Sequence, residues 1–282
     1  MEMLYDYTSD GLRLCALHWE IPTKDTCIVL IHGQGGNVLE NYFAHIWGRI
    51  FNENNIGFIY GHNRGHSHIN DIITKDNDLK RCGATFEIFE ESIYDVDLWV
   101  QKAYELGYKK VILMGHSLGC NKVIYYIHEK QPHLDGVILA SPPDMVGLTL
   151  LEEPTYEDLV KEAQANVDAG EPRKLLNELL DGYSYTSSEN FINLYTEGNN
   201  IDNLPIERNP EHFEQLESIN VKTLAFSGGN ETGPYAKIEL LKEKALNCPN
   251  FEVAFVEGSG HTYNNHEEDV ANLIVDWLNR NN

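Results

Sequence analysis

Short apolar runs alternate with amphipathic stretches along most of the chain. Six continuous runs rich in Val, Ile and Phe predict buried strands, at residues 27–33, 56–62, 109–115, 135–142, 221–229 and 250–258. Two more strands are expected before them, at 3–7 and 12–21. Stretches with apolar residues every three or four positions predict helices, at 41–51, 92–107, 118–131, 237–246 and 267–280. This order predicts an α/β fold, with a mostly parallel eight-stranded sheet and helices on both faces.

The strand pattern is interrupted between residues 142 and 218. This stretch contains no run typical of a buried strand, and three helices are expected instead, at 155–170, 172–182 and 187–198. Thr155 is a suitable N-cap, Gly170 a suitable stop, and Pro172 a suitable first residue for the second helix. We therefore expect a core formed by residues 1–141 and 219–282, with a helical cap, or lid, formed by residues 142–218 after the sixth strand.

Charge and cysteine content restrict the partners and the location. The chain has 44 Asp and Glu against 21 Lys and Arg, a net charge of −23, which argues against nucleic acid and anionic membranes as partners. No apolar run is long enough to span a membrane, and the first 20 residues lack the basic and apolar regions of a secretory signal. Five scattered cysteines without CxxC spacing favour a reducing, cytoplasmic setting. The pattern does not indicate an oligomeric state.

The motif most informative about chemistry is GHSLG, Gly115–Gly119, between a predicted buried strand and a predicted helix. It fits the G-x-S-x-G nucleophile elbow, in which a sharp turn exposes a serine hydroxyl at a helix N-terminus. The turn requires small residues two positions before and after the serine. Ser117 is therefore the candidate nucleophile.

A serine hydroxyl needs a base to accept its proton and an acid to orient that base. His261 follows the last predicted strand on a glycine-rich loop, and Glu231 follows the strand before it. The chain order Ser117, Glu231, His261 is the order in which this architecture carries its triad.

A second glycine-rich loop, His32–Gly35, follows another buried strand. Its spacing fits neither of the common phosphate-binding motifs. Backbone N–H groups in such a loop can hold the negative oxygen of a tetrahedral intermediate. We assign the amides of Gln34 and Leu118 as the two donors of this oxyanion hole.

These motifs together resemble the α/β-hydrolase superfamily, in particular its capped serine esterases. That resemblance covers nearly the whole chain and implies the α/β-hydrolase fold. The segment GHNRGHSHIN is similar to the family's D-x-R-G-x-G-x-S loop, with Asn63 in place of Asp and His66 in place of Gly. The family usually has Asp as the triad acid, so Glu231 is a departure. Some members take the acid from the strand before the cap, which makes Asp144 the alternative. The cap also faintly resembles that of fungal siderophore esterases.

The predicted activity is cleavage of a carboxylic ester, thioester or lactone through an acyl-enzyme intermediate. The same triad could support acyl transfer or cyclisation, and the same fold could serve a non-catalytic ligand-binding protein. The expected partner is a small-molecule acyl substrate whose identity the sequence does not give. No cofactor is needed for this chemistry.

Three further features of the sequence leave alternatives open. A group of possible metal ligands, His62, His66, His68 and Asp71, lies on a predicted loop, but the segment already matches a structural loop of the family, so no metal site is expected. Residues 143–218 hold 17 acidic and four basic residues, which indicates either a solvated surface or a preference for a polar or cationic substrate. The tyrosines of this stretch either line a pocket or pack within the cap; they are Tyr156, Tyr183, Tyr185 and Tyr195.

Overall fold

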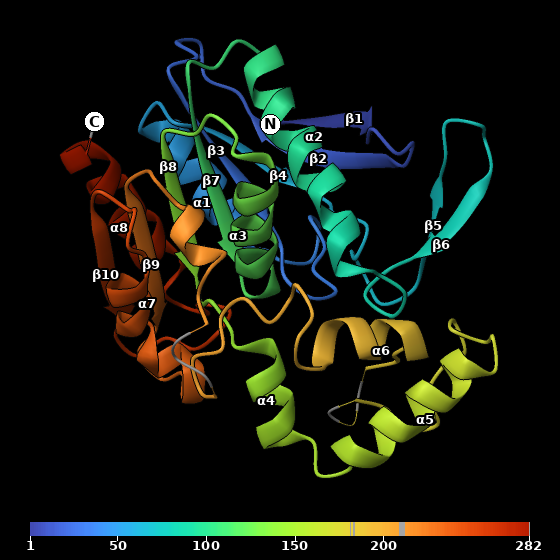
Figure 1. Ribbon diagram of the computed structural model, residues 1–282. Coiled ribbons are helices and arrows are strands. Elements are labelled where there is room, and N and C mark those ends of the chain that lie inside the picture. Colours follow the sequence, from blue (N-terminus) through green and yellow to red (C-terminus); the bar gives the residue numbers. More distant parts are fainter. Residues whose placement is uncertain (181, 183, 209–211, 282) are drawn as a thin grey trace.

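A computed structural model describes residues 1–180, 182, 184–208 and 212–281. Within these residues, eight strands form one sheet in the order β1-β2-β4-β3-β7-β8-β9-β10 (Figure 1). The strands are β1 (Glu2–Tyr7), β2 (Arg13–Trp19), β3 (Thr26–Ile31), β4 (Gly57–Gly61), β7 (Lys110–His116), β8 (Gly136–Ala140), β9 (Thr223–Gly228) and β10 (Phe251–Val256). They correspond to the eight strands that the sequence predicts.

The sheet is parallel from β4 to β10, and only β1 and β2 pair antiparallel with their neighbours. Every residue of β3, β4, β8 and β9 is buried, because helices cover both faces of the sheet. This explains why these strands are continuous apolar runs rather than alternating ones. The predicted mostly parallel, eight-stranded sheet is confirmed.

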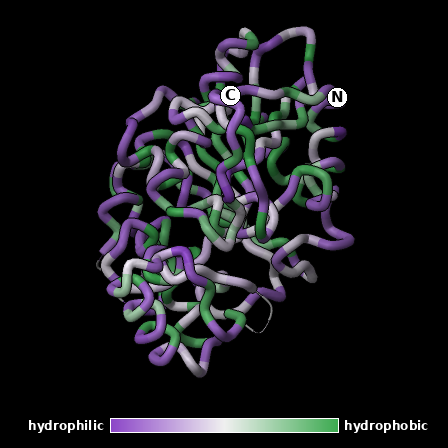
Figure 2. The backbone as a smooth tube through the Cα atoms, turned by 90° about the vertical axis from the view of Figure 1, so that its right-hand side faces the viewer, coloured by the Kyte–Doolittle hydropathy of each residue, from purple (hydrophilic) through white to green (hydrophobic). Residues whose placement is uncertain are grey.

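Five helices accompany the sheet strands: α1 (Phe43–Glu53), α2 (Ser92–Glu105), α3 (Leu118–Lys130), α7 (Glu239–Lys244) and α8 (Glu267–Asn281). The apolar residues of α2 and α3 share one buried cluster with α7, whereas those of α1 and α8 form a second cluster on the opposite face. Figure 2 shows the hydrophobic segments concentrated inside the molecule and hydrophilic ones around them. The parallel arrangement brings the carboxyl ends of β3, β7, β8, β9 and β10 to one edge.

The segment between β8 and β9, residues 142–218, is called the insert below. It contains α4 (Met145–Glu152), α5 (Tyr156–Asp168) and α6 (Ser188–Tyr195), which lie together beyond one edge of the sheet (Figure 1). A third buried cluster joins them to α3, through Leu118 and Tyr125. The insert is therefore packed onto the helix that carries the candidate nucleophile.

One predicted element of the insert is wrong. The expected helix at 172–182 does not form over its described residues, and Asp181 lies outside them. Instead, isolated bridges join Leu175 to Ser187 and Leu180 to Ser184. Leu176 and Leu180 are both buried, so their four-residue spacing reflects burial in the third cluster rather than a helical turn. The backbone N–H groups of Leu176 and Leu180 donate to the oxygens of Thr186 and Ser184, at 3.0 and 2.9 Å, instead of to a preceding helical turn.

Several short elements were not expected from the sequence. A two-stranded hairpin, β5 (Asn70–Ile73) and β6 (Leu79–Cys82), follows the loop after β4, and α4 replaces a stretch without predicted structure. The described residues also form three 3₁₀ turns: η1 (Phe89–Glu91), η2 (Leu216–Ser218) and η3 (Gly233–Lys237). Of the helix expected at 237–246, Lys237 belongs to η3 and Ile238 follows it. The helix α7 therefore begins only at Glu239 and is short.

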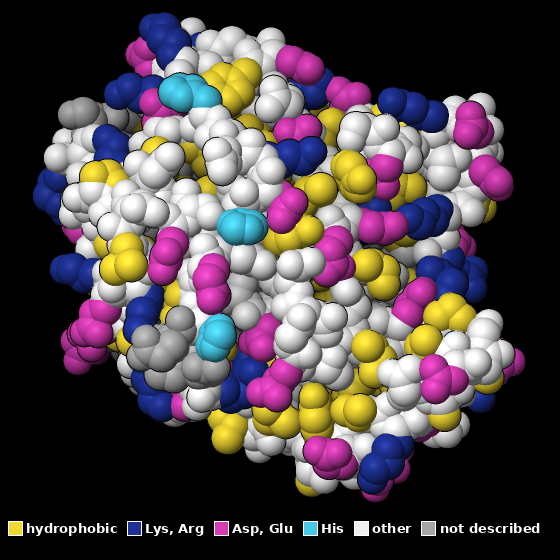
Figure 3. Space-filling model, in the orientation of Figure 1, with side chains coloured by type: hydrophobic (Ala, Val, Ile, Leu, Met, Phe, Trp, Pro, Cys, Tyr) yellow, Lys and Arg dark blue, Asp and Glu magenta, His cyan; other side chains and the backbone are white. Residues whose placement is uncertain are grey.

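The surface carries many acidic side chains (Figure 3), and the cysteines form no disulfide bonds. On the face in Figure 3, Asp and Glu side chains are spread over the surface and interspersed with Lys and Arg. All five cysteines are free thiols, three of them buried. Within the described ranges, helices are too short or too polar to cross a membrane.

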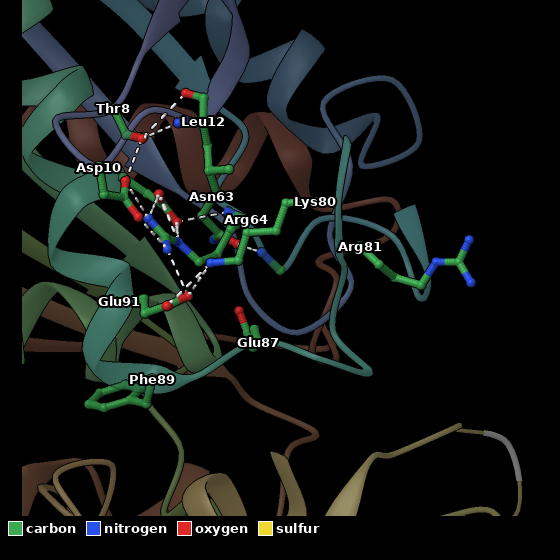
Figure 4. Close-up of polar contacts among 12 residues, drawn as sticks. Thr8, Asp10, Leu12, Asn63, Arg64, Lys80, Arg81, Glu87, Phe89 and Glu91 are labelled. Carbon is green, nitrogen blue, oxygen red and sulfur yellow. Dashed lines mark hydrogen bonds and ion pairs between the residues drawn. The ribbon is translucent and has the colours of Figure 1, made fainter. Parts of the chain in front are cut away.

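A buried arginine fixes the loop after β4. Arg64 is 1% exposed, and its guanidinium donates to Asp10 before β2 and to Glu91 in η1 (Figure 4). It also donates to Asp95 on α2. Asp95 is fully buried and also accepts the backbone N–H of Arg64 at 2.8 Å. Burial raises the pKa of Asp95 despite the neighbouring guanidinium. Arg64 therefore ties α2, the N-terminal hairpin and the loop that carries Asn63 into one unit.

Replacing Arg64 by Ala should lower the free energy of unfolding by about 3–5 kcal/mol, because it leaves the buried Asp95 carboxylate without its cation. Urea denaturation of the full-length protein measures this. Arg81→Ala is the matched control, since the Arg81–Asp71 pair is solvent-exposed and should contribute little. Equal, small effects of both substitutions would contradict the role assigned to Arg64.

Candidate active site

Ser117 occupies a strained turn between β7 and α3. Its φ of 55° and ψ of −133° lie outside the regions that non-glycine residues favour. A Cβ on Gly115 would lie 2.5 Å from the backbone of Gly119, and a Cβ on Gly119 would collide with the carbonyl oxygen of Ile31. The two glycines therefore allow α3 to start directly against β3 and β7, which is the geometry that the nucleophile elbow requires.

Ser117 lines a cavity of about 310 Å³ between the loops at the sheet edge and the insert. The loop after β3 contributes Gly33, Gln34 and Gly36, and the loop after β10 contributes His261 and Thr262. The remaining lining residues are His116, Tyr235, Asn41, His68, four residues of α4 (Met145, Leu148, Thr149 and Glu152), and Ser184 and Tyr195 of the insert. The candidate nucleophile and base thus open onto the same cavity.

His261 is held by Glu231. The His261 Nδ1 atom lies 2.6 Å from Glu231 Oε1, and the Glu231 side chain is only 4% exposed. Because a carboxylate can only accept, Nδ1 of the neutral ring carries the proton and Nε2 has the free lone pair. Burial raises the pKa of Glu231, but hydrogen bonds from His261 and Ser141 outweigh this, so the pKa lies below its usual value. The pair has the geometry of an oriented general base.

Ser117 and His261 line one cavity, yet no hydrogen bond joins their side chains among the contacts of the described residues. Catalytic hydrogen bonds are often long before substrate binds. The His261 side chain is 38% exposed, and its ring lies 5.0 Å from the ring centres of both His116 and Tyr235. These two rings flank the imidazole from the elbow side and from η3.

His116, the variable residue of the elbow motif, supports the loop that carries His261. Its Nε2–H donates to the backbone oxygen of His261 at 2.9 Å. Burial lowers the pKa of His116 to about 3, with a smaller contribution from the charge of His261. His116 is therefore neutral and acts as a structural donor. Sequence reasoning missed it because the motif leaves this position unspecified.

The predicted oxyanion donors lie beside Ser117. A Cβ placed on Gly33 would lie 2.7 Å from the Ser117 Cβ and 3.2 Å from its Oγ, so the loop backbone packs directly against the serine. Gln34 lines the cavity next to it. Leu118 is the first residue of α3, where backbone N–H groups have no partner within the helix. Both assigned amides therefore belong to backbone that adjoins the Ser117 hydroxyl.

Asn63 stabilises the loop after β3 through hydrogen bonds to His32. The Asn63 backbone N–H donates to His32 Nε2 at 3.0 Å, and its side-chain amide donates to the His32 backbone oxygen at 3.0 Å. His32 in turn donates from Nδ1 to the Gly33 oxygen at 2.8 Å. Asn63 can donate an amide hydrogen where an aspartate could only accept, which explains how this chain tolerates the departure from the family's loop motif.

Asp144, the alternative acid, does not contact His261. It caps α4 by accepting the Gly147 N–H at 2.8 Å and pairs with Arg208, whose Nη2 lies 2.8 Å from Oδ1. Its second oxygen accepts the Glu207 N–H at 3.0 Å. Both carboxylate oxygens are therefore occupied in holding the insert together.

Of the remaining candidates, His68 and Tyr195 line the cavity, and the other described ones do not. His62 and His66 stack with ring centres 3.8 Å apart, and His62 Nε2 accepts the Val38 N–H. In the portion of the chain that the structure describes, no group of three or more ligating side chains could hold a metal. Of the insert tyrosines, Tyr195 lines the cavity, Tyr156 packs on Phe191, Tyr185 is exposed, and Tyr183 lies outside the described residues.

Comparison with known proteins places the chain in a family. The model of a family described as "Protein of unknown function (DUF1749)" matches residues 91–247, more than half of the sequence. The chain belongs to this family. No functionally curated protein matches the sequence significantly.

Solved structures identify the fold. Est1E from Butyrivibrio proteoclasticus, bound to ferulic acid, is 16% identical over 99% of this chain and 98% of its own, with a TM-score of 0.67. The α/β hydrolase GrgF from Penicillium sp. sh18 is 13% identical over 99% and 98%, with a TM-score of 0.69. A thermostable carboxyl esterase from Bacillus coagulans is 15% identical over 99% and 97%, with a TM-score of 0.65. The protein has the α/β-hydrolase fold, as the sequence motifs predict.

Proposed function

We propose that the protein is a serine hydrolase that cleaves a carboxylic ester through an acyl-enzyme intermediate. The observation that carries this proposal is the Glu231–His261 pair, 2.6 Å apart, opening onto the cavity that the strained Ser117 also lines. The fold that the chain shares with esterases supports it.

In this mechanism, His261 Nε2 removes the Ser117 hydroxyl proton as Oγ attacks the substrate carbonyl carbon. Glu231 fixes the ring and stabilises its charged form. The amides of Gln34 and Leu118 hold the developing oxyanion. His261 then protonates the departing alkoxide, and the same base activates water to release the acyl group. The insert acts as a lid, and thioesters and lactones suit the same steps.

A fluorophosphonate probe should label the wild-type protein covalently, and Ser117→Ala should abolish the labelling, because the probe reacts only with an activated serine. Mass spectrometry of the intact protein and of the labelled peptide measures this. Ser227→Ala, which removes another buried hydroxyl, is the control and should label normally. A folded wild-type protein that does not react would favour a ligand-binding protein on this scaffold.

Glu231→Gln should lower kcat for a short-chain aryl ester by about 10³–10⁴-fold, because an amide can hold the His261 ring in the wrong tautomer. Asp144→Asn should instead lower the free energy of unfolding by about 1–3 kcal/mol and leave turnover per folded molecule within a few fold, because Asp144 serves Arg208 and α4. Steady-state kinetics and urea denaturation of both variants test this. Loss of turnover in Asp144→Asn alone would reverse the assignment of the acid.

The charge of the cavity lining favours substrates that carry a positive group. Glu152, on α4, is the lining residue with a permanent charge among those described, and neither Lys nor Arg lines the cavity. Glu152→Lys should therefore lower kcat/KM for a cationic ester relative to its neutral isostere by at least about two- to fivefold, and Glu152→Gln should lower it less.

Paired esters that differ only in a trimethylammonium or tert-butyl group provide the measurement, at low and high salt. Glu129→Gln is the matched control, because it removes one exposed charge at the far end of α3 from Ser117. Equal changes for Glu152→Gln and Glu129→Gln would show that net charge, rather than Glu152, sets the preference.

A further inference from the structure

Ser141 lies at the carboxyl end of β8 in a conformation that is unusual for serine. Its φ is 49°, it is fully buried, and its backbone N–H donates to the Phe226 oxygen of β9 at 2.7 Å. Strained residues of this kind persist only when their surroundings hold them in place. This backbone conformation turns the chain from β8 toward the insert. It also directs the Ser141 hydroxyl to the carboxyl end of β9.

The Ser141 hydroxyl contacts two groups at once. Its Oγ lies 2.6 Å from Glu231 Oε2 and 2.6 Å from the hydroxyl oxygen of Tyr263. A carboxylate only accepts, so the single Ser141 proton goes to Glu231, and Tyr263 must donate its own proton to Ser141 Oγ. Burial raises the pKa of Tyr263, which keeps that hydroxyl protonated. The result is a one-way chain of donors that ends on the carboxylate.

Tyr263 is itself a rigid anchor. It is fully buried, has a φ of 54°, and packs its ring against Trp47, Phe43 and Phe226. The backbone N–H of Gly228 adds a further donor to Glu231 Oε2, at 2.6 Å. One oxygen of Glu231 is therefore held by the protein interior, and the other, Oε1, is left for His261.

We propose that Ser141, backed by Tyr263, is a positioning residue that holds Glu231 ionised and aimed at His261. This inference rests on the proposed hydrolase function. Neither hydroxyl lines the cavity, so neither touches the substrate, and both act through Glu231.

The same contacts account for glutamate as the acid. Glu231 reaches His261 from the loop after β9 while Oε2 remains bound to Ser141 and Gly228. An aspartate at this position would withdraw the carboxylate by one C–C bond, about 1.5 Å, and could not keep all three contacts at hydrogen-bond distance.

The experiment compares Ser141→Ala, Ser141→Gly and Tyr263→Phe in the full-length protein. Both Ser141 variants remove the hydroxyl, but glycine also relieves the positive φ, so the pair separates the hydrogen bond from the backbone strain. Both should lower kcat for an aryl ester by about ten- to a hundredfold with KM within twofold, because a hydrogen bond to a charged group is lost. Tyr263→Phe should lower kcat by about two- to tenfold.

A second measurement is independent of turnover. The far-downfield NMR signal of the His261 Nδ1 proton, assigned by its absence in His261→Gln, reports the hydrogen bond to Glu231. It should shift or broaden in both Ser141 variants. Ser227→Ala is the matched control: the Ser227 hydroxyl is buried on the adjacent strand β9 and has no hydrogen-bond partner among the described residues, so kcat and the signal should not change.

Wild-type turnover by Ser141→Gly, or an unchanged Nδ1 signal in both Ser141 variants, would overturn the inference, because the hydroxyl would then be dispensable. If the wild-type protein turns over no ester, the proposed function fails, while the NMR comparison still decides whether Ser141 holds Glu231.

Discussion

A negative charge can remain inside this protein beside a histidine only if enough donors surround it. The carboxylate of Glu231 is almost completely removed from solvent, and three segments supply its donors: Ser141 after β8, Gly228 at the end of β9, and His261 after β10. These strands are consecutive neighbours in the sheet. The candidate site therefore depends on strand order, since exchanging any two of the three strands would separate the charge from a donor that it needs.

Much of this arrangement could be predicted from the sequence because the sheet strands are buried on both faces. Continuous apolar runs such as those at β3, β7 and β8 indicate buried strands even when the neighbouring strands in the sheet are not known. Once the strands are known, a serine between two glycines and a histidine after the last strand identify the carboxyl edge. The loop after β9, the seventh strand of the sheet in chain order, places Glu231 next to His261, whereas Asp144 contacts Arg208.

The features that escaped prediction depend on contacts between distant parts of the chain. The spacing of Leu176 and Leu180 suits a helix equally well, and only pairing with residues 184–187 decides against one. No sequence pattern marks Ser141 or His116. Their roles come from hydrogen bonds to residues far away in the sequence, Glu231 and His261. Lys122 is similar: in a sequence it resembles a solvated helix residue, yet it is fully buried and paired with Glu87 at 2.7 Å, with Asn63 nearby.

Part of the cavity wall comes from a different segment of the chain than the Ser117, Glu231 and His261 side chains, which affects how the substrate preference of such proteins can change. α4 supplies Met145, Leu148, Thr149 and Glu152 to the walls, whereas Ser117, Glu231 and His261 all come from loops at the carboxyl ends of the strands. Amino-acid changes on this one short helix can thus alter which molecules enter the cavity without disturbing the Glu231–His261 contact. Related proteins can therefore evolve new substrate preferences through a few substitutions on α4, and protein engineering can use the same positions.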